Sequence, residues 1–460
     1  MTRLRAGGWL RSAGVGLVFF PAVGYRSVEH PEILGRWSPT FAIMLTVIAI
    51  LWIAAMYQAV RRGPARSELA MARMVSLDVA VFVLGVGYAM TAATTPLAAG
   101  RIANLNLFGS EALVPALLEW IALVGLVGWA GLGLGPWLVR RGWSGPALLG
   151  GTLSVLGLLA EGAVRLQAHL FPTLEAVPTF SSKEWDRRFV RRNHDGYRDI
   201  EHQEAPGQRR RVLVIGDSFG MGWGVEHLED RFSEQLARGL GATTGVEWES
   251  ITAAETDRDT RQELEMLHGS LHYCPDLVVL LYVFNDIDYL VPVTRRAPLF
   301  ENATLRARFS PLRIAFLNSY LFQKLYAYAS LLPIGGNRGP SATVTAYRDS
   351  AMLARHFDDL HHFVDAASRD GAAVVIVPFE VAGVADSAIA SRYDDFARRG
   401  IEAGLPVVRI DSAFRGRSLD ELTFSAKNRH PNALAHHLAA AATVDRLRPY
   451  LTKRRPRCAR

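Results

Sequence analysis

Residues 211–220 have the sequence RVLVIGDSFG, in which a short apolar run ends at a Gly-Asp-Ser turn. Similar runs rich in Val, Ile and Leu alternate with stretches of helical periodicity, and they lie at 246–252, 276–284, 373–378 and 406–410. Strands that alternate with helices of this length indicate a mainly parallel sheet covered by helices on both faces. The pattern therefore predicts a three-layer α/β/α domain with a five-stranded sheet.

Reactive side chains of such a domain gather at the carboxyl ends of its strands. Ser218 follows the first expected strand and precedes a helix, so its Oγ can be exposed where the N–H groups of the turn also point. Asn285 follows the third strand and can donate its side-chain N–H to a developing oxyanion. Near the C-terminus, His430 stands in a loop before a helix that Pro431 would start. This histidine can be the general base for Ser218.

Other chemistries fit the sequence less well. The glycines at 220, 222 and 224 fail the dinucleotide-loop spacing G-x-G-x-x-G, because Val225 stands where the third glycine belongs. The adjacent histidines at 361–362 and at 436–437 would not share a helix face. The two cysteines lack the spacing of a zinc site. We therefore expect neither a metal nor a cofactor.

Taken in order, these motifs resemble those of the SGNH/GDSL hydrolase superfamily over about residues 190–448. The Gly-Asp-Ser-Phe block at 216–219, the Gly-Trp-Gly-Val block at 222–225 and the lead-in NHDGYRD at 193–199 look like its membrane-tethered bacterial branch. The resemblance implies an SGNH/flavodoxin-like fold for this part of the chain.

The resemblance also implies roles for particular residues. Ser218 would be the nucleophile and first oxyanion donor, Asn285 the side-chain donor and His430 the base. Two positions depart from the family pattern. The second-block glycine is Ala254, which still offers its N–H to the oxyanion hole, and the acid before the histidine is Asn428. An asparagine can orient the imidazole through its amide oxygen, but it lacks the charge that stabilises imidazolium.

Loss of that charge costs on the order of 10⁴ in turnover in a Ser-His-Asp enzyme. Three nearby acids, Asp411, Asp420 and Glu421, could replace the missing one. The site could also work as a Ser-His dyad.

The N-terminal third has a different character. Residues 1–170 hold 13 arginines, no lysine and 7 acidic residues, a net charge of +6 out of +7 for the whole chain. Long apolar stretches that could each cross a hydrocarbon core of about 30 Å lie at about 40–60, 76–99, 111–135 and 145–165. A weaker stretch at 12–25 brings the expected number to about five spans. Glu119 lies within a span, so it is either a functional carboxylate or one packed against a neighbouring helix.

Arginines crowd two of the connecting loops, at 61–73 and at 140–141, whereas the loop between these two has only Arg101. Basic loops stay in the cytoplasm, so residues 171–460 would lie outside it. This predicts a multi-pass protein of the bacterial inner (cell) membrane with an extracytoplasmic catalytic domain.

The expected boundaries are a transmembrane domain at 1–170, a linker and lead-in at 171–205, a hydrolase-like domain at 206–450 and a basic tail at 451–460. Within the hydrolase-like domain, residues 287–345 form a long insertion with an apolar and aromatic run. Insertions of this length are often functional. We expect a helical cap over the site, a surface resting on the membrane, or an extra helix packed on the core.

These patterns predict an extracytoplasmic serine esterase or deacetylase that hydrolyses ester groups, O-acetyl above all, on a cell-envelope glycan or lipid. Two alternatives stay open: a polysaccharide O-acyltransferase that uses the same serine with a membrane acyltransferase partner, and a non-catalytic glycan-binding module. The expected partners are the lipid bilayer and the envelope glycan or acyl ester. Nucleic acid is not expected, because the basic excess lies in the membrane half and in the tail.

Overall fold

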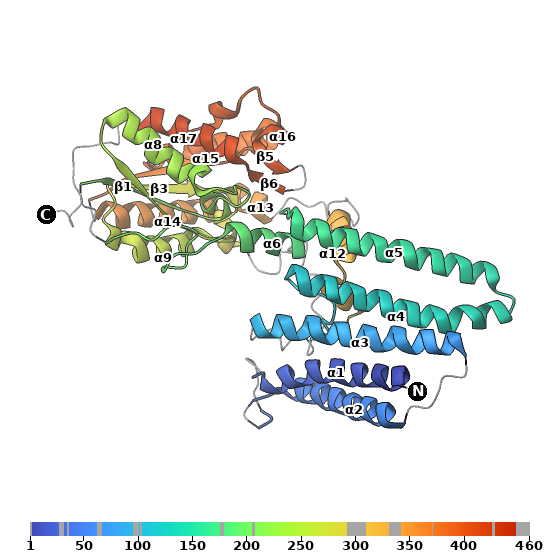
Figure 1. The fold of residues 1–460 in the computed structure, drawn as a ribbon. Coiled ribbons are helices and arrows are strands. Elements are labelled where there is room, and N and C mark those ends of the chain that lie inside the picture. The colour runs from blue at the N-terminus through green and yellow to red at the C-terminus, as the bar shows by residue number, and fades with distance from the viewer. Residues whose placement is uncertain are drawn as a thin grey trace. The chain divides into compact units, whose positions relative to one another are not determined.

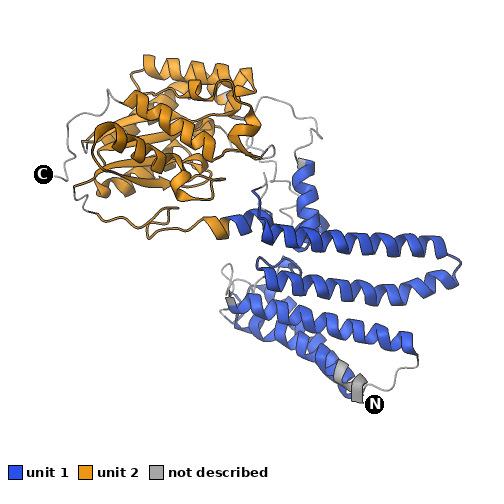
Figure 2. Cartoon of the chain, turned by 45° about the horizontal axis from the view of Figure 1, so that its top comes forward, with its two compact units in different colours: residues 1–185, 299–334 blue, residues 186–298, 335–460 orange. Residues whose placement is uncertain are grey.

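The chain forms two compact units in a computed structural model. Unit 1 comprises residues 1–185 and 299–334, and unit 2 comprises residues 186–298 and 335–460 (Figure 2). The structure describes residues 2–26, 32–34, 36–61, 67–94, 101, 104–174, 179–204, 208–291, 310–330, 342–369, 371–425 and 428–447.

Unit 1 is helical. Its helices are α1 (Thr2–Gly24), α2 (Pro39–Arg61), α3 (Glu68–Thr94), α4 (Leu113–Arg140), α5 (Ser144–Leu170), α11 (Pro311–Asn318) and α12 (Tyr320–Ser330), and α6 (Phe180–Phe189) continues into unit 2 (Figure 1). Among the described residues, four helices are long and apolar enough to cross a membrane, namely Pro39–Val60, Glu68–Ala93, Leu113–Arg140 and Ser144–Leu170. The weaker stretch expected at 12–25 lies in α1, which is not one of the four.

A buried ion pair holds Glu119 of α4. Arg101 binds Glu119 at 2.9 Å, and the same carboxylate accepts the N–H of Ser110 at 2.9 Å. Glu119 is fully buried. These contacts agree with the structural interpretation of Glu119, a carboxylate held between neighbouring segments.

Two helices of the expected insertion belong to unit 1. Glu161 of α5 accepts the N–H groups of Tyr320 and Leu321, both at 3.0 Å, and the hydroxyl of Ser319 at 2.7 Å. Arg165, one helical turn further on, donates to the carbonyl of Asn318 at 3.2 Å. A carboxylate at the first N–H groups of a helix caps it, so α5 supplies the cap of α12.

Unit 2 is built on a parallel sheet with the strand order β2-β1-β3-β4. The strands are β1 (Arg210–Gly216), β2 (Trp248–Ala254), β3 (Leu277–Tyr282) and β4 (Ala373–Pro378). Alternate residues of β1 point to opposite faces, where Leu213 and Ile215 join one core cluster and Val212 and Val214 the other. Both faces are covered, which explains why the strands are continuous apolar runs.

The helices of unit 2 divide between these faces. One cluster contains side chains of α9 (Thr260–Ser270), α14 (Ser350–Arg369) and α15 (Ser387–Glu402), and the other contains those of α8 (Phe232–Thr244) and α17 (Ala433–Leu447). Figure 1 shows α9 and α14 on one side of the sheet and α8 and α17 on the other. The remaining elements are α7 (Ser218–Met221), α13 (Ala342–Arg348), α16 (Leu419–Leu422), β5 (Thr423–Ser425), β6 (Asn428–Pro431) and the 3₁₀ helices η2 (Leu228–Asp230), η3 (Leu271–Tyr273), η4 (Phe284–Leu290), η6 (Ala382–Val384) and η7 (Asp411–Phe414).

The fifth strand expected at 406–410 is reduced to one parallel bridge, between Val407 and Ile376. Ile376 donates to the carbonyl of Pro406 at 2.9 Å and accepts the N–H of Val408 at 2.8 Å. The pairing stops there, because the chain turns into η7 at Asp411. The sheet of the described residues thus has four strands.

Candidate active site

Ser218 is the first residue of the short helix α7, directly after β1 and Asp217. Asp217 is the N-cap, and its Oδ1 accepts the N–H of Phe219 at 2.9 Å. The N–H groups of a first helical turn have no partner inside the helix. The N–H of Ser218 is therefore available to a negatively charged group beside its own Oγ.

His430 reaches this serine from the hairpin formed by β5 and β6. The distance from its Nε2 to Ser218 Oγ is 3.0 Å, and its Nδ1 contacts Oδ1 of Asn428. The same Oδ1 accepts the backbone N–H of His430 at 3.2 Å. Because an amide oxygen only accepts, Nδ1 carries the proton and Nε2 is free to accept the serine hydroxyl. The structure thus brings Ser218, His430 and Asn428 together in the arrangement of a nucleophile, a base and an orienting group.

The imidazole of His430 is held in the neutral form. Burial lowers the pKa of His430 to about 4. The ring of Phe219 lies 5.3 Å away and covers it. Asn428 brings no negative charge that would offset the loss of water around an imidazolium. The ring is therefore unprotonated at neutral pH, and its surroundings stabilise an imidazolium poorly.

None of the three alternative acids has a hydrogen bond or ion pair with His430 among the described residues. Asp411 pairs with Arg409 at 3.1 Å and Arg415 at 3.4 Å, Glu421 lies 3.9 Å from Arg417, and Asp420 is exposed. The orienting partner of the imidazole is Asn428.

The hairpin also corrects the local expectation around His430. The segment is a strand, not a loop, and α17 begins at Ala433, two residues after Pro431. The N-terminal cap comes from Asn432, whose Oδ1 accepts the N–H of Ala435 at 3.1 Å. His436 is fully buried in α17 and accepts the N–H of Phe232 at 3.1 Å, so it caps α8.

Asp217 is a site residue that the sequence did not single out. Its carboxylate accepts the Nδ2–H of Asn285 at 3.3 Å, in addition to the N–H of Phe219. Its Oδ2 also lies 3.4 Å from Ser218 Oγ, where it competes with His430 Nε2 for the single hydroxyl proton. Asn285 begins the turn after β3, as expected, and this contact brings its amide beside the nucleophile turn. Burial raises the pKa of Asp217 to about 6. Its position next to Ser218 was the available signal, but the contact with Asn285 depends on the adjacent strands.

Ala254 packs its Cβ against Gly220 of the nucleophile turn, but its N–H points elsewhere. The N–H of Glu255 donates to the carbonyl of Gly216 at 3.3 Å, so it points toward β1. The N–H of Thr252 donates to Asp199 Oδ2 at 2.7 Å, beyond the outer edge of β2. Because N–H groups alternate between the two edges of a strand, that of Ala254 points outward with Thr252. This geometry contradicts the expectation that Ala254 supplies an oxyanion donor.

Two further carboxyl groups are buried near Asp217. Both oxygens of Glu263 in α9 are buried and have no hydrogen-bond partner among the described residues, and Asp286 accepts the N–H of Val283 at 2.8 Å. Burial, and then the charges of Asp217 and of the neighbouring acids, raise the pKa of both groups well above the ordinary range. Burial thus favours the neutral form of both side chains, and it also raises the pKa of Asp217 beside them.

No family model and no curated protein matches the sequence. Solved structures do match the chain over about half of its length. They are lipases. A lipase from a goat-rumen metagenome is 15% identical, covers 52% of this chain and 98% of its own, and has a TM-score of 0.34.

A lipase/acylhydrolase from Enterococcus faecalis is 16% identical over 54% of this chain and 98% of its own, with a TM-score of 0.33. A GDSL-like lipase from Bacteroides thetaiotaomicron is 11% identical over 53% and 92%, with a TM-score of 0.28. At such identities and TM-scores the likeness carries no weight for the chemistry. The assignment of the site depends on the side-chain contacts of Ser218, His430, Asn428 and Asp217.

Proposed function

We propose that unit 2 is a serine ester hydrolase of the SGNH/GDSL superfamily. The observation that carries this proposal is the 3.0 Å contact between Ser218 Oγ and His430 Nε2, with Asn428 fixing the tautomer of the ring. A serine becomes a nucleophile when an adjacent base accepts its proton and a third group orients that base. Each of these three parts is present.

In the proposed reaction Ser218 Oγ forms a bond to the ester carbonyl carbon while its proton passes to His430 Nε2. The N–H of Ser218 and the Nδ2 group of Asn285 hold the oxyanion of the tetrahedral intermediate. The intermediate then expels the alcohol, which takes the proton from His430, and leaves an acyl group on Ser218. Water attacks this acyl-enzyme by the same route, and the acid departs.

The proposed substrate is an ester outside the cytoplasm, an O-acetyl group on a cell-envelope glycan or a lipid ester. Two features support this location. In the part of the chain that the structure describes, four helices are apolar enough to span a membrane. The arginine-rich loops at 61–73 and 140–141 favour an inner-membrane protein whose residues 171–460 are extracytoplasmic. The bilayer and an envelope glycan are accordingly the proposed partners.

The full-length chain in detergent micelles tests the proposal. We expect it to release p-nitrophenol from p-nitrophenyl acetate and acetate from an O-acetylated polysaccharide, and a fluorophosphonate should label Ser218. Ser218→Ala and His430→Ala should abolish turnover. Ser412→Ala is the matched control, because Ser412 is exposed and its hydroxyl binds only Arg446 among the described residues.

Three results would redirect the interpretation. Acyl transfer to an added oligosaccharide that outpaces hydrolysis would make the protein an O-acyltransferase with the same nucleophile. Glycan binding that Ser218→Ala leaves intact, without turnover, would make it a binding module. The absence of both turnover and fluorophosphonate labelling would refute the esterase.

A further inference from the structure

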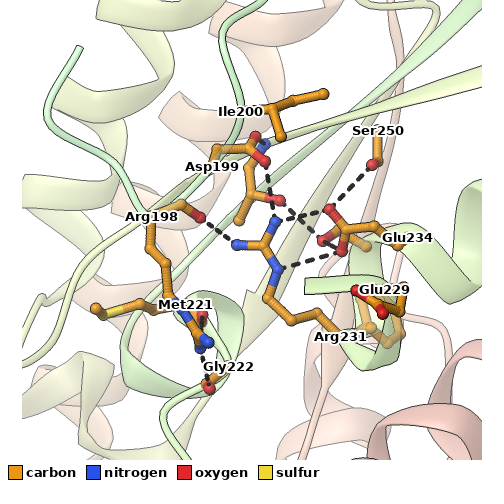
Figure 3. Close-up of polar contacts among 12 residues, drawn as sticks. Arg198, Asp199, Ile200, Met221, Gly222, Glu229, Arg231, Glu234 and Ser250 are labelled. Carbon is orange, nitrogen blue, oxygen red and sulfur yellow. Dashed lines mark hydrogen bonds and ion pairs between the residues drawn. The ribbon is translucent and has the colours of Figure 1, made fainter. Parts of the chain in front are cut away.

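Arg198 lies in the lead-in segment 193–199 and contacts the loop that follows the nucleophile helix. Its guanidinium is buried, with 1% of the residue exposed. All five of its described hydrogen bonds go to backbone carbonyls, which are those of Phe189 (2.9 Å), Met221 (3.4 Å), Gly222 (2.6 Å), Val225 (2.7 Å) and Glu226 (3.2 Å). In Figure 3 the side chain of Arg198 points toward Met221 and Gly222. The planar fork of one arginine thus binds both ends of the segment 221–226.

That segment is bonded in turn to the backbone of the catalytic turn. The N–H of Met221 donates to the carbonyl of Asp217, and the N–H of Trp223 donates to the carbonyl of Ser218, both at 2.9 Å. Gly222, between these two donors, ends α7 with a φ of +73°. A shift of the segment would therefore move the backbone that carries the nucleophile and the first oxyanion donor.

Arg231 fixes Arg198 in place. It donates to the backbone carbonyl of Arg198, to Asp199 Oδ1 at 2.9 Å and to Glu234 Oε1 at 2.6 Å (Figure 3). The other oxygen of Asp199 accepts the N–H of Thr252 in β2 at 2.7 Å. The lead-in is therefore held by both α8 and the outer edge of the sheet. These contacts fix the backbone from which the side chain of Arg198 extends.

The close approach of Arg231 also explains why residue 222 of the loop is a glycine. A Cβ on Gly222 would lie 2.7 Å from Arg231 Cγ and 2.8 Å from its Cδ. The same loop contacts the hairpin of the base, since a Cβ on Gly224 would lie 3.3 Å from Cβ of Phe424 in β5. The clamped loop thus lies between the element that carries the nucleophile and the one that carries the base.

We infer that Arg198 is a positioning residue, which holds the loop 221–226 and through it sets the place of Ser218 relative to His430. This inference rests on the proposed esterase function. Hydrogen bonds from a charged donor are stronger than those between neutral groups. The planar guanidinium of arginine also fixes the geometry of two acceptors at once, which the ammonium of lysine does not do. A displacement of about 1 Å at a reacting group can cost about 10² in rate.

Arg198→Lys tests the inference, because it keeps the positive charge but loses the fork. We expect kcat to fall by roughly 10- to 100-fold with KM nearly unchanged. We also expect the amides of residues 219–225 to exchange with deuterium at least about 10-fold faster, since the loop loses its clamp.

Arg211→Lys is the matched control. Arg211 is equally buried, with 1% exposed, and its fork donates to three backbone carbonyls and to Glu249 Oε2 at 2.8 Å. It lies at the other end of β1 from Ser218. Both variants should lower the melting temperature, but Arg211→Lys should leave kcat and the exchange of residues 219–225 unchanged.

An equal loss of kcat in the two variants, or exchange in Arg198→Lys as slow as in the wild type, would overturn the inference. A wild-type chain with neither turnover nor fluorophosphonate labelling would refute the esterase, and the exchange measurement would then still decide whether Arg198 clamps the loop. Both variants are measured in the full chain in detergent micelles.

Discussion

Replacement of Asn428 by aspartate should convert a weak base into a strong one. The carboxylate would stand where Oδ1 of Asn428 now contacts Nδ1 of His430. Burial holds the pKa of His430 at about 4, and a return to the ordinary value of about 6.5 corresponds to roughly 3 kcal/mol for the imidazolium, or a factor of about 300. The reverse change in a Ser-His-Asp enzyme costs about 10⁴. We therefore expect kcat to rise by between roughly 10² and 10⁴.

The assay is the steady-state hydrolysis of p-nitrophenyl acetate by the full chain at pH 8, where the base is neutral in both proteins. Asn428→Ala provides the opposite control, because it removes the acceptor that fixes the tautomer, and its kcat should fall below that of the wild type. The double variant Asn428→Asp with Ser218→Ala should be inactive. An unchanged rate in both Asn428→Asp and Asn428→Ala would refute the reasoning, since Asn428 would then not orient the base.

Three other changes give distinct outcomes. Asn285→Ala should lower kcat by about 10²- to 10³-fold with little change in KM, because it removes an oxyanion donor; an unchanged kcat would exclude that role. In the wild type, protonation of Asp217 below about pH 6 weakens the acceptor that holds the amide of Asn285, so kcat/KM should fall as the pH drops through 6. In Asp217→Asn the fall of kcat/KM should move toward pH 4, the pKa of His430. If kcat/KM of this variant still falls at pH 6, a group other than Asp217 titrates there. Glu263 has a raised pKa, so the native state binds more protons than the unfolded one and loses stability as pH rises. Glu263→Gln should therefore melt a few degrees higher than the wild type at pH 8 and at the same temperature at pH 4; equal melting temperatures at both would show that the group is not a buried neutral acid.

The parallel sheet and the nearness of Ser218 to Asn285 follow from features that the sequence displays. Apolar runs alternate with helical periods, and the polar residues Ser218 and Asn285 come directly after two strands that lie side by side in the sheet. Parallel strands place such residues at one edge of the sheet.

Other features depend on which atoms of the backbone face one another. The N–H of Ala254 points outward because of the register between β1 and β2, which the residue type does not reveal. The fifth strand fails because the pairing with Ile376 ends after Val408. The role of Arg198 depends on carbonyl groups, which every residue carries, so no residue pattern indicates it.

The packing partner of the helices α11 and α12 could not be predicted from the sequence either. Their attachment to α5 is made by Glu161 and Arg165, which are more than 150 residues away along the chain. An apolar and aromatic composition predicts that such helices pack on something, but it does not identify the partner.

The capping of α12 by Glu161 has a consequence for how the protein can be cut. Because residues 299–334 belong to unit 1, the polypeptide passes between the units three times, near residues 185, 298 and 334. A nick near residue 298 would leave two fragments that each contain parts of both units. Such fragments should copurify until the detergent or a denaturant disrupts the packing within each unit. One proteolytic cleavage therefore cannot release unit 2 in a soluble form.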